Sequence, residues 1–189
     1  DMPVFVNLRE SQLGILGAPE LCRAVLSNYL FRLCFFQSYR DLSIILLCRA
    51  ADSALRSAFS WCPQFEGKDF RCSGILSYTQ EAETVLGGLL QQIKERKRKA
   101  GEEKKSGYFL PQYLLVAEDA SLLAGHSLLS YLDETSPELG ISLIYCAERR
   151  EQLPESVKTI VSVEGGGEGL LCLRNGLIAT ERLRLELPD

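Results

Sequence analysis

Short hydrophobic runs alternate with segments of helical periodicity along the chain. Apolar runs of roughly four to eight residues, bounded by glycine or polar residues, are typical of strands. The run at 42–48, LSIILLC, is almost continuously apolar, as expected of a strand that is covered on both faces. Strands are therefore predicted, in chain order, at 11–17, 42–48, 70–77, within 112–123, at 141–148 and at 159–164.

A long helix is predicted over 18–37, directly after the first strand. Pro19 falls in its first turn, where the missing N–H costs little because that group would have no partner inside the helix. The apolar residues lie nearly all round this helix. We therefore expect it to be buried among other elements.

Three further helical segments follow. A short helix at 53–59 could be capped by Asp52, and an amphipathic helix over 78–100 starts with Thr79 as its expected cap. The segment 127–140 predicts a helix followed by a turn. Each of these helices thus stands between two predicted strands.

This alternation of strands and helices predicts a mostly parallel sheet with helices on both faces, which is a three-layer α/β sandwich. The glycine-rich segment 165–169 separates two apolar runs at 159–164 and 170–176, so these two are expected to form a β-hairpin near the C-terminus. After them the chain ends as an extended segment with apolar residues at alternate positions. We expect one domain, spanning residues 1–189.

Composition narrows the function classes. The net charge of −4 gives no reason to expect nucleic-acid binding. No apolar run approaches the roughly 20 residues that span a bilayer, and no signal peptide is visible. The chain opens Asp-Met-Pro and soon enters a strand-like run, so we expect a piece cut from a longer protein whose other parts could include membrane spans. The seven cysteines form no C-x-x-C pair, which argues against a disulfide framework and against a zinc site.

The segment GAPELCRA after the first strand has the layout of a phosphate-binding loop, G-x-x-x-x-G-K-[ST]. Gly17 supplies the first glycine. Cys22 then stands where the second glycine should be, Arg23 replaces the lysine, and Ala24 replaces the hydroxyl residue that would hold Mg²⁺. Pro19 also removes one N–H donor from the cradle. These four positions are therefore interpreted as a degenerate P-loop.

The strand LLVA is followed by Glu118 and Asp119, the two acids of a Walker B motif in reversed order. Each acid then has the wrong reach for holding Mg²⁺ or for activating water. Two acids at a strand end could instead cap the helix that follows. His126 is the only histidine and is expected to be a surface residue or a contact at a helix start. No catalytic residue, cofactor or metal site is predicted.

A charged segment at 94–107, KERKRKAGEEKKSG, has two interpretations. It is expected to be the solvated end of the long amphipathic helix running into a loop, because cations are favourable at a helix C-terminus. The alternative is a docking segment for an acidic partner or for phosphate.

The segment 13–48 resembles the opening of the first ATPase-like domain in the EssC/EccC membrane ATPases of type VII secretion systems, which are of the FtsK/SpoIIIE class. The resemblance continues through WCPQF at 61–65, through 111–119, and through the segment LGISLIYCAERREQLPESVKTIVSV at 139–163. Gln37 and Ser38 stand where the family usually has a leucine and a histidine.

The resemblance implies a RecA-like, P-loop NTPase-like domain on the cytoplasmic side of a bacterial cell membrane. Expected partners are the transmembrane region and the adjacent ATPase domain of the same chain, other type VII secretion components and, for the parent protein, a hexameric ring; nucleic acid is not expected. The implied function is non-catalytic coupling in protein export. Two alternatives remain open: a divergent NTPase that uses Arg23, Glu118 and Asp119, and a docking module for secretion partners.

Overall fold

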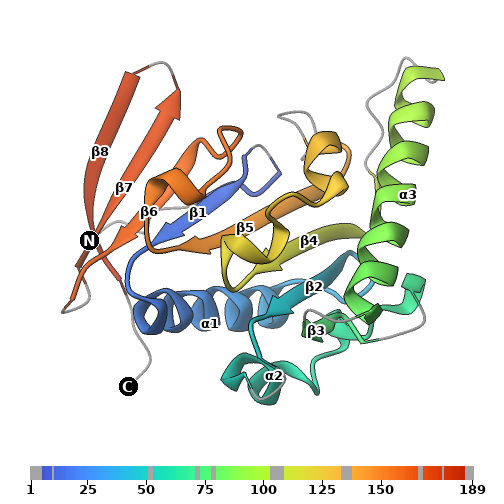
Figure 1. Cartoon of the computed structure of the whole chain (residues 1–189), viewed down its shortest axis with the longest axis horizontal. Coiled ribbons are helices and arrows are strands. Elements are labelled where there is room, and N and C mark those ends of the chain that lie inside the picture. The colour runs from blue at the N-terminus through green and yellow to red at the C-terminus, as the bar shows by residue number, and fades with distance from the viewer. Residues whose placement is uncertain are drawn as a thin grey trace.

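The computed structural model places eight strands in one sheet, ordered β3-β2-β4-β5-β1-β6-β7-β8 (Figure 1). It describes residues 6–9, 11–50, 53–70, 73–77, 80–102, 109–132, 138–165, 168–175 and 177–185. The strands are β1 (Leu13–Leu16), β2 (Leu42–Cys48), β3 (Ile75–Ser77), β4 (Gln112–Ala117), β5 (Ile141–Ala147), β6 (Thr159–Val163), β7 (Glu168–Asn175) and β8 (Leu177–Arg184).

The sheet is mostly parallel, as the alternating pattern predicts. All pairings among the first six strands along the chain are parallel. β7 runs antiparallel to β6 and β8 antiparallel to β7, so the hairpin predicted around 165–169 is confirmed and is extended by one further strand.

Helices cover both faces of this sheet. The α-helices are α1 (Pro19–Phe36), α2 (Ala54–Phe59) and α3 (Gln80–Glu102). Short 3-10 helices occur at η1 (Pro63–Phe65), η2 (Lys68–Phe70), η3 (Ala120–Leu123), η4 (Ser127–Tyr131) and η5 (Arg150–Gln152). A helix is predicted over 127–140. In the described part of that segment, the only helix is the short η4. The expected caps Asp52 and Thr79 lie outside the described residues.

Two hydrophobic cores lie on opposite sides of the sheet because side chains alternate along each strand. In β4, Leu114 and Val116 pack on the side of α1 and α2, whereas Tyr113 and Leu115 pack on the side of α3 and the 3-10 helices η3 and η4. Both layers of helices and the sheet between them are visible in Figure 1. The predicted three-layer sandwich is therefore confirmed.

The helix α1 is not buried all round, contrary to the expectation from its composition. Its buried residues, Cys22, Val25, Leu26 and Leu30, form one stripe in its first three turns. Three phenylalanines in its last two turns, Phe31, Phe35 and Phe36, are nevertheless exposed, the last two at 73% each, whereas Leu33 and Cys34 in the same turns are partly buried against the core. Hydrophobicity in this half of the helix therefore does not indicate burial.

The strand order brings three chain turns to one edge of the sheet. β5 lies between β1 and β4, with Leu16 beside Ala147 and Ala117 beside Tyr145. The residues that follow these strands are therefore neighbours, although they lie far apart in the sequence. In open α/β sheets this edge, beyond the carboxyl ends of the parallel strands, is where ligands bind.

Candidate functional site

The residues predicted as remnants of a nucleotide site do meet at this edge. Gly17, Cys22 and Arg23 lie after β1, Glu118 and Asp119 lie after β4, and all five line one cavity. Other lining residues come from the ends of β2 and β5. The cavity measures about 30 Å³, room for only a few water molecules. Pockets for small-molecule ligands measure roughly 300–1,000 Å³.

The turn after β1 packs against the sheet and does not curl round an open space. The Gly17 N–H donates to the carbonyl oxygen of Ala147 at 3.1 Å. A Cβ atom at Gly17 would lie 2.8 Å from the carbonyl oxygen of Val163 in β6, so this close approach requires glycine. With that amide engaged and with no N–H on Pro19, two donors of a phosphate cradle are missing.

Sulfur fills the place of the second P-loop glycine. The buried Cys22 thiol donates to the carbonyl oxygens of Ile15 at 3.7 Å and of Ala147 at 4.0 Å. A hydrogen bond with the Cys146 thiol is the main cause that lowers the pKa of Cys22, and the same contact together with burial raises the pKa of Cys146. Ala24, the last P-loop position, is not among the residues that line the cavity.

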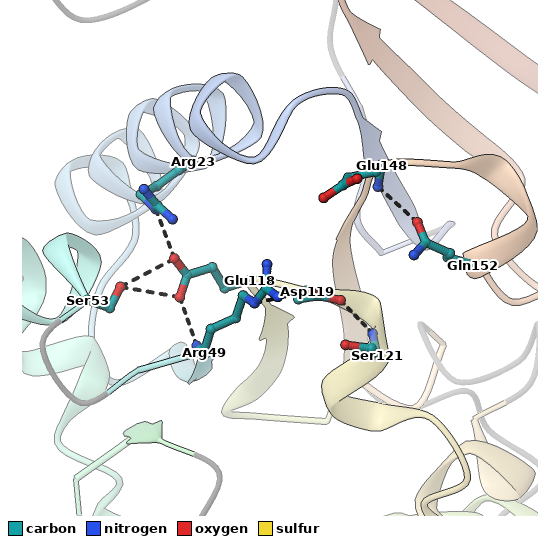
Figure 2. A network of polar contacts seen from close by, with 8 residues as sticks. All are labelled: Arg23, Arg49, Ser53, Glu118, Asp119, Ser121, Glu148 and Gln152. Atoms are coloured by element: carbon teal, nitrogen blue, oxygen red, sulfur yellow. Dashed lines mark hydrogen bonds and ion pairs between the residues drawn. The ribbon is translucent and has the colours of Figure 1, made fainter.

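Arg23 and Glu118 form an ion pair with each other (Figure 2). The Arg23 Nε atom lies 2.9 Å from Glu118 Oε1. The Glu118 side chain is only 5% exposed. Its carboxylate also accepts from the Ser53 hydroxyl at 3.2 Å and from the Arg49 backbone N–H at 3.0 Å. The positive and negative remnants of the two motifs therefore neutralise each other inside the protein.

Sequence reasoning missed Arg49 and Ser53, which lie between β2 and α2. They reach Glu118 because β2 pairs with β4, and the Glu118 N–H donates to the Leu47 carbonyl oxygen at 3.0 Å. Neither residue belongs to a recognisable motif. Only the order of the strands in the sheet could have pointed to them.

Asp119 is engaged as a helix cap. Its carboxylate accepts from the Ser121 N–H at 2.8 Å at the start of η3, and it lies 3.4 Å from the Arg49 Nε atom. This is the capping role that the sequence offered as an alternative to metal binding. Among the described residues, no group of three or more His, Cys, Asp or Glu side chains could hold a metal ion.

His126 contacts a helix start, one of the two roles expected of it. Its Nδ1 atom accepts from the Leu128 N–H at 3.1 Å and caps η4, while Nε2 lies 3.3 Å from a carboxylate oxygen of Glu83 in α3. It does not line the cavity at the sheet edge.

The charged segment 94–107 is partly helical, since α3 extends to Glu102, and one of its cations is not solvated. Arg96 is 6% exposed and donates to the carbonyl oxygens of Leu139, Gly140 and Pro111. The expectation of a solvated helix end is therefore wrong at Arg96. Residues 103–107 lie outside the described residues.

None of the described helices combines the length and the apolar character that crossing a bilayer demands.

No protein-family model matches the chain. The chain is 25% identical over 174 residues to the ESX secretion system protein EccC of Geobacillus thermodenitrificans and 30% identical over 172 residues to the type VII secretion system protein EssC of Staphylococcus aureus. These matches cover 92% and 89% of the chain but only 12% of each relative.

Solved structures show the same fold. The chain matches Thermomonospora curvata EccC (ATPases 2 and 3) in complex with a signal sequence peptide, with a TM-score of 0.64 at 10% identity, over 99% of this chain and 40% of that one. It also matches EssC (ATPases 2 and 3) from Geobacillus thermodenitrificans, with a TM-score of 0.65 at 13% identity, over 96% of this chain and 41% of that one. The RecA-like ATPase fold implied by the sequence resemblance is thus confirmed.

Proposed function

Given that this chain belongs to the EssC/EccC family of type VII secretion systems, we propose that it is a non-catalytic coupling domain of the secretion motor. In this role it binds no nucleotide. It acts as a rigid connector between the membrane region and the downstream ATPase domains of the same polypeptide, on the cytoplasmic side of the membrane. It transmits movement between these parts during protein export.

One observation carries this proposal: the edge of the sheet where ATPases hold nucleotide is internally neutralised. Arg23 is paired with the nearly buried Glu118, and the remaining cavity is about 30 Å³. A triphosphate would have to separate this pair, leave the nearly buried Glu118 carboxylate without its counter-charge beside the negative phosphates, and displace packed backbone at Gly17. Each of these steps opposes binding.

The proposed setting follows from the relatives. The chain spans about an eighth of the length of the curated relatives that it matches, and their solved structures carry ATPases 2 and 3 in one chain. We propose that this domain stands beside such ATPase domains. A hexameric ring of the parent protein and contacts with other secretion components belong to the same proposal.

Coupling can be tested in the longer polypeptide by breaking the internal ion pair. Arg23→Ala is expected to lower protein export while the ATPase rate of the downstream domains stays unchanged, because the connector is loosened and no active site is touched. Lys99→Ala, a change at an exposed cation of α3 that lies neither in the sheet-edge cavity nor beside exposed aromatic residues of α1, is the matched control. Equal export by the two variants would contradict the coupling role.

A divergent NTPase is the second candidate, because Arg23, Glu118 and Asp119 do gather at the edge where this fold binds ligands. A divergent NTPase would keep a measurable ATPase rate when the downstream ATPase sites are disabled. Arg23→Ala would then abolish that remaining rate. Absence of such a rate would leave the non-catalytic role.

A further inference from the structure

Large aromatic side chains are exposed around the C-terminal end of α1. Phe31 is 57% exposed, Phe35 and Phe36 are each 73% exposed, Tyr39 is 42% exposed and Trp61 is 73% exposed. We call these five residues the aromatic surface. They make up most of the large apolar side chains that stand exposed in the described part of the chain. Singly exposed aromatic residues need no explanation, whereas a cluster does.

The phenylalanines of the aromatic surface form a continuous row. The rings of Phe31 and Phe35 are stacked with centroids 6.4 Å apart, and Phe35 meets Phe36 edge-on at 5.1 Å. They stay more than half exposed although they already cover one another. The row therefore presents apolar area that no other element of the fold uses.

The segment that follows Trp61 is hydrogen-bonded to the end of α1. The buried Gln64 side chain in η1 donates to the carbonyl oxygens of Cys34 at 2.9 Å and of Gln37 at 2.8 Å, at the end of α1. The thiols of Cys34 and Cys62 are in hydrogen-bond contact, and that contact adds to the burial that raises the pKa of Cys34 to about 12. Since Trp61 directly precedes Cys62, these contacts bring the segment that carries Trp61 to the end of α1.

The size and chemistry of the aromatic surface match one side of an interface. Aromatic side chains bury about 150–250 Å² each, so these five, which are 42–73% exposed, present roughly 500–800 Å². A standard interface takes about 800 Å² from each partner. Arg32 and Arg40 are exposed and lie next to these residues in the sequence. The Arg40 guanidinium carbon lies 6.0 Å from the Tyr39 ring centroid. Aromatic residues and arginine are the types enriched in interface centres.

We propose that the aromatic surface docks onto a neighbouring domain of the same polypeptide. The occupant follows from the amount of chain outside this domain: relatives are about eight times longer, and their solved chains hold more than one ATPase domain. Tethering gives such a neighbour an effective concentration of the order of millimolar. At this effective concentration, a surface of this size suffices to keep the two domains docked without strong intrinsic affinity. The inference rests on the proposed function only in placing the chain within such a polypeptide.

The test compares the oxidation rates of aromatic side chains by hydroxyl-radical footprinting and mass spectrometry, without nucleotide. The isolated 189-residue chain is compared with the full-length polypeptide. Phe31, Phe35 and Trp61 are expected to oxidise about tenfold more slowly in the full-length protein, because a packed interface centre excludes water. Tyr131, exposed elsewhere on the domain, is expected to oxidise at the same rate in both and serves as the internal control.

Variants show whether docking causes the protection. Phe35→Ser in the full-length polypeptide is expected to return Phe31 and Trp61 to their rates in the isolated chain, whereas Tyr131→Ser leaves them protected. The melting temperature of the isolated Phe35→Ser chain confirms that the fold survives.

Equal oxidation rates in the isolated chain and in the full-length polypeptide would overturn the proposal. So would concentration-dependent protection in the isolated chain, which would make a second copy the occupant, or protection gained only on adding anionic phospholipid vesicles. Because nucleotide is absent throughout, these outcomes are independent of whether the sheet edge binds ATP.

Discussion

Glu118 shows at the scale of a single residue how a site of this fold can be closed. Its carboxylate is almost out of water, and its charge is balanced by Arg23 and supported by two hydrogen-bond donors. A buried ion pair adds little stability compared with an apolar pair, but the removal of one partner is costly. The pair therefore specifies one arrangement of α1, β4 and the loop after β2.

Arg23→Ala is expected to lower the free energy of unfolding by about 1–3 kcal/mol, because Glu118 would keep its neutral donors but lose its counter-charge. The Arg23 side chain is 37% exposed, so solvent limits the loss. Urea denaturation measures it. Arg40→Ala, at a surface position, should stay within about 0.5 kcal/mol. Similar midpoints for the two variants would count against the role of the pair.

Arg96 makes a second residue-level case, because its guanidinium donates to three backbone carbonyls and lies 4.7 Å from the Tyr113 ring centroid. Arg96→Met is expected to cost about 3 kcal/mol, since the carbonyls of Pro111 and Leu139 would lose their Arg96 donor, while that of Gly140 keeps the Tyr113 N–H. Lys99→Met, on the exposed part of α3, should cost less than about 0.5 kcal/mol. Thermal denaturation of both variants decides between a structural and a solvated cation.

At the scale of elements, the turn between β1 and α1 has the sequence layout of a phosphate-binding loop but does not pack like one. A phosphate-binding loop has free amides round an open space. Here the turn contacts the ends of β5 and β6, so it stabilises the sheet edge instead of offering donors.

Gly17→Ala is expected to destabilise the protein by about 1–3 kcal/mol, because the new methyl group would lie 2.8 Å from a backbone oxygen that cannot move away cheaply. Gly87→Ala is the matched change within α3. Its Cβ atom would meet nothing within 4 Å, so it should stabilise by about 0.5–1 kcal/mol. Opposite shifts in melting temperature are expected, and shifts of the same sign would contradict this account of the turn.

Hydropathy was sufficient to predict the strands of the sheet and the start of α1, because strands buried on both faces have an unmistakable composition. It could not predict that Arg23 would meet Glu118, 95 residues away, since that contact depends on β5 lying between β1 and β4. It also misplaced two groups. Phe31, Phe35 and Phe36 in the last turns of α1 are apolar but exposed, and Arg96 lies in a charged run but is buried; only the tertiary packing decides either case.

For the whole molecule, the chain has the fold of the solved EccC and EssC ATPase domains, while the protein's own side chains are paired with one another at the sheet edge where this fold binds ligands. We propose that the function of this chain depends on two regions, the closed sheet edge and the aromatic surface, and not on a ligand site.

The central claim is that this sheet edge does not bind nucleotide. Calorimetric titration of the 189-residue chain with ATP and Mg²⁺ tests it most directly. The account predicts no saturable heat and no rise in melting temperature at millimolar ATP. Saturable binding in the micromolar range that is lost in Arg23→Ala would contradict it.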